Sequence, residues 1–241
     1  MYYKSLAVIF STLLLDLSLS SLPEVALAQE LNPARAGLPG RRVGGGTRGN
    51  CNFGAKMLTA LVPKNNLAST VAANPQLFFY IPQISKFQEL EFVVLDENDN
   101  QVYEKKFTST GKAGIIGINL PESSQLKGLK IGKKYHWYLS VICNPADRAN
   151  DIAVDGWIQR VTPNRNLTSK LRRKLAPLQL VHEYTAAGLW QEALTTLAQL
   201  RYSHPHDSTL AAEWSKLLHS VDLDSIAQEP LVQCCTFEAI K

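Results

Sequence analysis

Between residues 51 and 163, short strand-like runs alternate with turn residues. Seven runs stand out by their apolar alternation and by their β-branched and aromatic content. They occupy residues 57–62, 76–81, 89–95, 101–107, 115–120, 135–143 and 153–161. The stretch DENDN between the third and fourth runs predicts a hairpin. Seven short strands in a segment of this length are typical of two packed antiparallel sheets, so residues 51–163 are predicted to form a β-sandwich domain.

A local pattern before the sixth run makes this prediction more specific. Leu129, Gly132 and Tyr135 give the spacing L-x-x-G-x-x-Y, which leads into an aromatic strand. The spacing resembles the tyrosine corner of fibronectin type III and immunoglobulin-like domains, where the tyrosine hydroxyl bonds back to the preceding connection. This resemblance implies an immunoglobulin- or fibronectin-III-like sandwich in which Tyr135 opens the sixth strand.

The first 28 residues have the features of a secretory signal peptide. Lys4 precedes a mostly apolar run over residues 6–15, and Ala26-Leu27-Ala28 offers a small-x-small cleavage site. An uncleaved anchor is the alternative interpretation. Cleavage predicts an exported protein, either periplasmic or extracellular. The remaining sequence has no apolar stretch of about 18 residues, so no transmembrane segment is expected after cleavage.

Four cysteines bear on the fold because disulfides are common in exported proteins. They are Cys51, Cys143, Cys234 and Cys235, and three pairings are open. On the immunoglobulin-like map, Cys51 and Cys143 lie at the same pole of the sandwich, so a bond between them is geometrically reasonable. For the adjacent pair Cys234 and Cys235, long-range or intermolecular bonds are favoured over a bond with each other. The spacings do not match a zinc site.

Residues 29–50 are predicted to form a flexible, basic, glycine-rich arm. Gly44, Gly46 and Gly49 match the G-x-G-x-x-G spacing of a dinucleotide-binding loop. That loop needs a strand before it and a helix after it. Here Pro and Gly precede the pattern and Asn-Cys-Asn-Phe-Gly follows it, so no cofactor is predicted.

The composition changes after residue 163 and predicts a helical domain over residues 164–225. Pro177 is expected to start a helix, Gly188 to end it, and Asp207 or Ser208 to cap a third one. One tetratricopeptide-like unit fits this region, through Tyr184, Gly188, Trp190, Ala193, Leu197 and Pro205. A helical hairpin with a third helix packed on the sandwich is favoured, and a shallow peptide-binding groove is the alternative. Residues 226–241 form a C-terminal tail with the Cys pair.

Two groups of charged residues are candidates for recognition. The first is the connection between the last two strands, with Asp147, Arg148, Asp151 and Asp155. It is predicted as a recognition loop, and an ordinary polar loop or a carboxylate-based hydrolase site are the alternatives. The second is a basic patch for an anionic partner, formed by Arg41, Arg42, Arg48, Arg165, Lys170, Arg172, Arg173 and Lys174. A solvated helix face is the plain alternative.

The overall charge restricts the class of partner. Removal of the leader leaves 24 basic and 19 acidic residues, a mild excess that permits an acidic polysaccharide or an anionic membrane surface. Nucleic acid is a poor partner for an exported protein. The five histidines form no recognisable pair with a nucleophile or a carboxylate. The sequence therefore predicts a non-enzymatic binding module for a protein or glycan partner of the envelope or exterior, with no catalytic or metal-ligating residues.

Several stretches together resemble a known family. These are RRVGGGTRGNC, FFYIP, EFVVLDENDNQVY, LKIGKKYHWYLSVICNPADR, GWIQRV, GLWQEALTTLAQLR and PLVQCC, which extend from Arg41 to Cys235. They resemble a family of exported cyanobacterial proteins catalogued only as a domain of unknown function. The resemblance implies a cyanobacterial source and export, and it carries no activity or catalytic residues.

Overall fold

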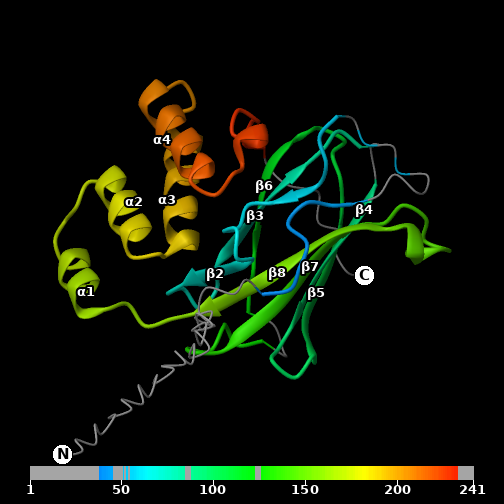
Figure 1. Ribbon diagram of the computed structural model, residues 1–241, viewed down its shortest axis with the longest axis horizontal. Helices are drawn as coiled ribbons and strands as arrows, with labels where there is room; N and C mark the ends of the chain where they lie inside the picture. Colours follow the sequence, from blue (N-terminus) through cyan, green and yellow to red (C-terminus); the bar gives the residue numbers. More distant parts are fainter. Residues whose placement is uncertain are drawn as a thin grey trace, which may run out of the picture. The chain divides into compact units, whose positions relative to one another are not determined.

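Two β-sheets form the body of the structure, a computed structural model that describes residues 38–45, 51, 53, 55–84, 88–122 and 126–232. The smaller sheet has the strand order β1-β3-β6 and the larger one β2-β8-β7-β4-β5 (Figure 1). The smaller sheet contains β1 (Thr59–Ala60), β3 (Gln76–Ile81) and β6 (Gly114–Asn119). The larger sheet contains β2 (Leu67–Thr70), β4 (Glu89–Leu95), β5 (Gln101–Thr108), β7 (Lys134–Val141) and β8 (Ile152–Arg160).

Strand β2 runs parallel to β8, so the prediction of purely antiparallel sheets is wrong at this edge. The register runs from Leu67 opposite Trp157 to Thr70 opposite Arg160. The preceding turn closes with a hydrogen bond from Asn66 N to the carbonyl oxygen of residue 63 (2.9 Å), and Asn66 has a φ of 59°. This turn moves the chain from the smaller sheet to the edge of the larger one, where it runs in the same direction as β8.

The core lies between the two sheets and follows the pleat of their strands. In β7, Tyr135, Trp137 and Leu139 are buried and the residues between them are partly exposed. Phe79 of β3 meets Trp137 edge-on, with ring centroids 5.3 Å apart. Such edge-to-face pairs add to the hydrophobic gain of burying the rings. The period-2 alternation of the sequence therefore becomes one apolar face on each strand.

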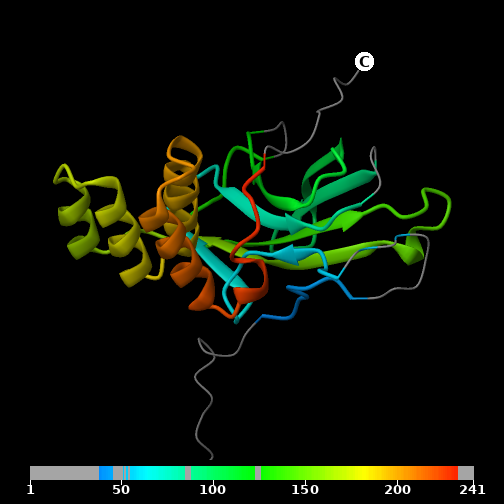
Figure 2. The ribbon, with the colours of Figure 1, turned by 90° about the horizontal axis from the view of Figure 1, so that it is seen from above.

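Within the described part of the chain, four α-helices follow β8, and Figure 2 shows them at one end of the sandwich. They are α1 (Arg165–Leu171), α2 (Pro177–Ala186), α3 (Trp190–Ser203) and α4 (Ser208–His219). The predicted signals for helix ends are confirmed. Pro177 is the first residue of α2, Gly188 has a φ of 70° after its end, and Asp207 caps α4 by accepting a hydrogen bond from Thr209 N (2.8 Å).

The helices pack on the sandwich as part of one continuous core. Trp190 is 7% exposed, and its indole Nε1 donates to the carbonyl oxygen of Leu61 (2.8 Å). Trp214 of α4 is fully buried in the same apolar cluster as the residues between the sheets. Among the described residues, no helix has the length and apolar character that a membrane span needs.

Residues 38–45, here called the strap, are hydrogen-bonded into the fold, although they belong to the segment predicted as a flexible arm. Gly44 N donates to the carbonyl oxygen of Leu58 beside β1 (2.7 Å). Asp155 N of β8 donates to the carbonyl oxygen of Arg41 (3.0 Å). The strap therefore contacts both sheets. Gly46, Gly49 and Arg48 lie outside the described residues.

The side chain of Arg42 connects the strap to the residues that follow α4. Its guanidinium donates to the carbonyl oxygens of Val62 (3.3 Å), Val221 (2.7 Å) and Asp222 (3.2 Å). Burial lowers the pKa of Arg42, and the nearby Asp222 opposes this effect. The side chain therefore acts as a structural link between residues far apart in the sequence.

A disulfide joins Cys51 to Cys143, with Cα atoms 5.2 Å apart, which confirms the pairing considered from the sequence. At the opposite end of β7, Lys130 N donates to the hydroxyl oxygen of Tyr135 (3.2 Å). This is the bond that the L-x-x-G-x-x-Y spacing predicts. Cys234 and Cys235 lie outside the described residues.

The last described residues return to the smaller sheet. After the short 3-10 helix Asp224–Ile226, Ile115 N of β6 donates to the carbonyl oxygen of Pro230 (2.7 Å), and Val232 N donates to that of Ile115 (2.9 Å). The start of the predicted tail therefore covers the outer edge of β6. At the other edge of this sheet the strap covers β1.

Candidate functional site

The predicted recognition loop is held in place by an ionic network centred on Arg148. Its guanidinium bonds to Asp151 (Nε to Oδ2, 2.5 Å) and to Glu91 of β4 (Nη2 to Oε2, 2.7 Å). Lys106 of β5 also pairs with Glu91 (3.3 Å). Asp147 caps the 3-10 helix Arg148–Asn150 by accepting a hydrogen bond from Ala149 N (3.2 Å). The network fixes the loop on strands β4 and β5 of the larger sheet.

The charges in this network depend on one another. Hydrogen bonding to Arg148 lowers the pKa of Glu91, and burial partly opposes this effect. The two carboxylates in turn raise the pKa of Arg148 above its ordinary value. Asp151 also accepts a hydrogen bond from Cys143 N (3.1 Å), beside the disulfide. The loop is therefore connected to both β4 and Cys143.

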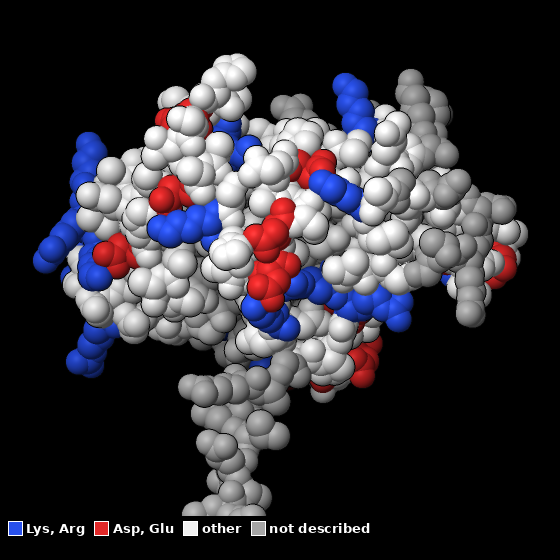
Figure 3. All heavy atoms as spheres, turned by 45° about the horizontal axis from the view of Figure 1, so that its top comes forward, with Lys and Arg blue, Asp and Glu red and all other residues white. Residues whose placement is uncertain are grey.

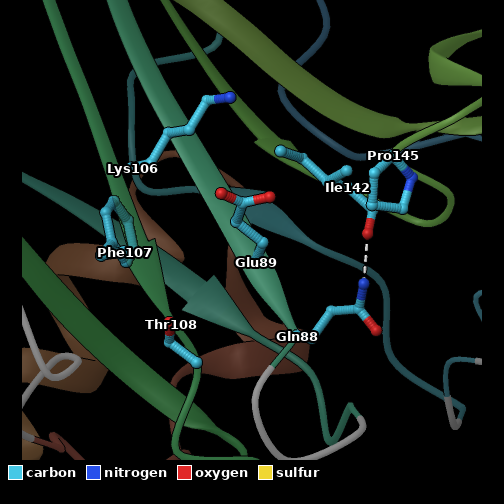
Figure 4. A pocket seen from close by; sticks show the side chains of 7 residues that line it. All are labelled: Gln88, Glu89, Lys106, Phe107, Thr108, Ile142 and Pro145. Carbon is cyan, nitrogen blue, oxygen red and sulfur yellow. Dashed lines mark hydrogen bonds between the residues drawn. The ribbon is translucent and has the colours of Figure 1, made fainter. Parts of the chain in front are cut away.

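A pocket of about 310 Å³ lies beside this loop. Figure 4 shows the side chains that line it. It is lined by the start of β4, the end of β5 and the residues after β7, namely Gln88, Glu89, Lys106, Phe107, Thr108, Ile142 and Pro145. Gln88 Nε2 donates to the carbonyl oxygen of Ile142 across the pocket. The lining combines a carboxylate, an ammonium group, a hydroxyl and apolar carbon. We call this the loop-end pocket.

Asp155, the fourth predicted loop residue, belongs to a different cluster. It lies within β8, and its Oδ2 accepts a hydrogen bond from His136 Nε2 (2.8 Å). The Tyr138 hydroxyl lies 2.9 Å from His136 Nδ1, and the Trp157 ring stacks on that of His136 with centroids 4.2 Å apart. The other oxygen of Asp155, Oδ1, accepts a hydrogen bond from Arg41 N of the strap (2.8 Å).

The polar groups of His136, Tyr138 and Asp155 find hydrogen-bonding partners within the cluster and in the strap. If Nε2 of His136 carries the proton, the ring donates to Asp155 and accepts from the Tyr138 hydroxyl. Burial raises the pKa of Tyr138, and the charges of Asp155 and Asp99 raise it further, so the phenol keeps its proton. Both oxygens of Asp155 have partners, and its backbone pairs with the strap. The cluster therefore fastens the strap to the outer face of the larger sheet.

This cluster was not predicted from the sequence, although the sequence carries a signal for it. His136 and Tyr138 are two residues apart, as are Asp155 and Trp157, and His136 lies opposite Trp157 in the β7–β8 ladder. Polar and aromatic residues at every second position mark the solvent side of a strand. Pairing the two strands in register would have brought the four side chains together.

The three carboxylates of the hydrolase alternative have separate partners. Asp147 caps the 3-10 helix, Asp151 bonds to Arg148 and to the backbone at Cys143, and Asp155 bonds to His136 and to the strap. In a carboxylate-based hydrolase of the glycosidase type, two carboxyl groups flank the bond that breaks. The observed bonds do not bring the three groups to a common point.

The predicted basic patch divides in the structure. Lys and Arg side chains project around α1, at the left of Figure 3. The exposed members there are Arg165, Arg172, Arg173 and Lys174. Lys170 pairs with Glu183 (2.7 Å), Arg42 bonds to backbone carbonyl groups, and Arg41 lies in the strap. The four exposed residues, here called the basic end, form a narrower patch than the sequence predicted.

Comparisons with known proteins identify a family for this chain. No curated protein matches the sequence. A family model described as Domain of Unknown Function (DUF928) matches residues 43–231. The match begins within the strap and ends at Leu231 beside β6, so it covers both sheets, all four helices and the loop-end pocket. The chain therefore belongs to the DUF928 family.

Proposed function

We propose that this protein is an exported, non-enzymatic recognition module whose loop-end pocket binds a segment of a partner protein. The observation that carries the proposal is the pocket of about 310 Å³ beside the loop held by Arg148. The disulfide between Cys51 and Cys143 supports an oxidising compartment, because such bonds persist mainly in exported proteins. The apolar run before Ala28 supports a cleaved leader.

The chemistry of the pocket favours a protein partner. Phe107 and Ile142 supply apolar carbon, while Glu89 and Lys106 supply charges of both signs. A mixture of apolar contacts and a few placed polar groups suits a peptide segment with a side chain that enters the pocket. The Arg148 network holds the adjoining loop before binding, which reduces the entropy lost when a complex forms.

The arrangement of the strands supports an immunoglobulin- or fibronectin-III-like sandwich. The first strand of such a sandwich corresponds to β1 in one sheet and β2 in the other, β4 and β5 form a hairpin at the edge of the larger sheet, and Tyr135 makes the bond of a tyrosine corner. Such sandwiches commonly bind partners through loops at their ends. The α2–α3 hairpin fits a single tetratricopeptide-like unit, as the sequence spacing predicts, and we propose that it supports the sandwich.

Site-specific photo-crosslinking tests the proposal. A photoreactive phenylalanine analogue replaces Thr108 in the pocket or, as a matched control, the exposed Thr162 before α1. Each variant is incubated with an envelope and exoprotein extract of the source organism, and crosslinked proteins are identified by mass spectrometry. We expect one partner to be captured from position 108 and not from position 162. The purified partner should then bind the wild-type protein.

A charge reversal in the pocket provides the second arm. Lys106→Glu should weaken binding of the purified partner by about tenfold or more, because it places like charges beside Glu89 and Glu91. The same reversal at Lys174 should leave binding unchanged. Equal capture from both crosslinking positions would contradict the proposal. Turnover of a glycan, ester or peptide panel by the purified protein would contradict its non-enzymatic part.

The basic end supports a second candidate function, the binding of an acidic polysaccharide or an anionic membrane surface. Arg165, Arg172, Arg173 and Lys174 are exposed, and the sequence has no acidic residue between Asp155 and Glu183. Binding through these charges should weaken steeply as salt rises. Sedimentation with pectate or with phosphatidylglycerol vesicles, at low and high salt, measures this dependence. Binding that persists unchanged in high salt would exclude the basic end.

A further inference from the structure

A second pocket, here called the seam pocket, lies where the helices meet the sandwich. Its volume is about 270 Å³. One wall is the connection between β2 and β3 with the end of β6, and the other wall is α3 with Tyr184 of α2. Both walls stand on the same continuous core, to which Leu77 of β3 and Leu194 of α3 belong, so the pocket is built into the fold. It shares no lining residue with the loop-end pocket.

The wall from α3 is a polar stripe. The residues that line the pocket are Gln191, Glu192, Thr195, Thr196 and Gln199, which recur with the period of a helix. The opposite face of α3, formed by Ala193, Leu194, Leu197 and Ala198, is buried in the apolar core. Polar side chains on a helix normally face water. Here they face a second polar wall, to which the sandwich contributes Asn74, Gln76 and Asn119.

Two anchors fix the walls relative to each other. Glu192 Oε1 accepts hydrogen bonds from the Thr70 hydroxyl (2.6 Å) and from Val71 N (2.7 Å). Gln191 is 2% exposed, and its Nε2 donates to the carbonyl oxygen of Gln76. These bonds tie α3 to the connection between the strands. The pocket is therefore largely formed before any ligand arrives, which favours binding.

Other polar groups in the lining are available for hydrogen bonds with a ligand. The side chains of Thr195, Thr196 and Asn119, and the hydroxyl of Tyr184, make no hydrogen bond with any other described residue. Burial raises the pKa of Tyr184, and the charge of Glu192 raises it further, so the hydroxyl keeps its proton and can donate. The pocket thus presents an aromatic ring together with hydroxyl and amide groups that can both donate and accept.

The charge of the lining restricts the ligand. Among the described residues that line the pocket, Glu192 is the one acidic residue, and none is a lysine or arginine. A carboxylate without a cationic partner in the lining disfavours an anion. Few of the lining residues have apolar side chains, which disfavours a hydrophobic ligand. A ligand with many neutral hydroxyl groups and one flat carbon face matches this combination.

We propose that the seam pocket binds a neutral sugar ring, either as a free saccharide or as part of a glycan chain. The ring would stack its carbon–hydrogen face against Tyr184, while its hydroxyl groups exchange hydrogen bonds with Thr195, Thr196 and Asn119. Binding of the sugar is independent of the partner protein proposed for the loop-end pocket. A site built to bond hydroxyl groups discriminates strongly against ligands that lack them.

Titration of the intact mature chain with saccharides tests the proposal. The probes are neutral monosaccharides (glucose, galactose, mannose, xylose and N-acetylglucosamine), their neutral oligomers, and pectate as the acidic arm. Saturation-transfer NMR detects binding and isothermal titration measures Kd. We expect at least one neutral saccharide to bind, with an affinity that does not change in high salt. Tighter binding of the oligomer than of the monomer would identify a glycan chain as the source, and equal binding a free sugar.

Three variants locate the binding. Thr196→Val and Tyr184→Phe each remove one hydroxyl and preserve the shape of the side chain, so each should weaken binding by about tenfold. Thr209→Val makes the same change at an exposed position of α4 outside the pocket and should have no effect. Thermal unfolding by circular dichroism confirms that each variant is folded. The proposal is overturned if no neutral saccharide binds at millimolar concentration, if the pocket variants bind like the wild type, or if only pectate binds.

Discussion

The disulfide between Cys51 and Cys143 should contribute a large share of the stability of this fold. The bond closes a loop with a sequence separation of 92 residues. In the chain-entropy model, a cross-link of this span lowers the conformational entropy of the unfolded chain. At 25 °C this loss of entropy raises the free energy of unfolding by about 4.6 kcal/mol. For a domain of this size, that loss corresponds to a fall in Tm of roughly 10 to 15 °C.

The measurement compares two proteins that differ only in this bond. Both carry Cys234→Ser and Cys235→Ser, and one also carries Cys51→Ser and Cys143→Ser. Trp137 and Trp214 are fully buried, so their fluorescence follows unfolding in guanidinium chloride. We expect the midpoint to fall and the slope m to rise modestly, because the native surface is the same while the unfolded chain without the cross-link expands and exposes more surface.

Two results would separate the entropic explanation from others. A difference in unfolding free energy below about 1 kcal/mol would refute the loop-entropy reasoning for this bond. A large fall in m together with the midpoint would show that the released unfolded chain keeps residual structure and exposes less surface than the entropic model assumes. Reduction of the native protein with dithiothreitol should reproduce the behaviour of the serine variant.

Three further predictions concern single side chains. Arg42→Met should lower the unfolding free energy by about 2 to 4 kcal/mol, because it removes the donors to three carbonyl groups, while the exposed Arg41→Met should change it by less than about 0.5 kcal/mol in the same guanidinium assay. Gly188→Ala should cost about 1 kcal/mol in thermal unfolding, since the φ of 70° strains a Cβ although no atom lies within 4 Å of it, and Gly188→Asn should cost less. Glu91→Gln should cost about 0.5 to 1 kcal/mol near neutral pH. The folded-state pKa of Glu91 lies below its ordinary value of 4.5, so its contribution is present above that value and lost as the pH falls through the folded pKa. Wild type and Glu91→Gln should therefore converge in acid titrations of stability, and a constant gap would contradict the role of Arg148.

Local signals predicted most of the regular elements. The alternation of Tyr135, Trp137 and Leu139 predicted the buried face of β7, and the spacing of Gly132 and Tyr135 predicted the bond at its start. Pro177 and Asp207 predicted where α2 and α4 begin. Such signals act within a few residues of the chain, where backbone geometry and capping decide the conformation. The mixed β and α composition of the fold was therefore predictable.

Features that depend on distant residues were not predictable from the same signals. Strand β2 has only four residues, and its parallel partner β8 lies far along the chain. The strap has the glycine, proline and arginine content of a flexible segment, yet Asp155 and Leu58 provide its hydrogen-bonding partners. The seam pocket combines polar residues from the ends of three strands, the connection between two of them and two helices, and most of these residues alone resemble solvated surface positions. Only the tertiary structure brings such groups together.

The link between Arg42 and residues 221 and 222 also limits when this protein can finish folding. The strap is made early in synthesis, but the carbonyl groups that Arg42 bonds appear only after α4. The outer edge of β6 is likewise covered only after residues 230 and 232 have been made, because their backbone groups bond to Ile115. Contacts of such long sequence separation slow folding, because loop closure costs entropy before the contacts form. A growing chain that lacks its last twenty or so residues therefore keeps the strap and the edge of β6 unpaired. In that interval the nascent chain is open to chaperones and to aggregation.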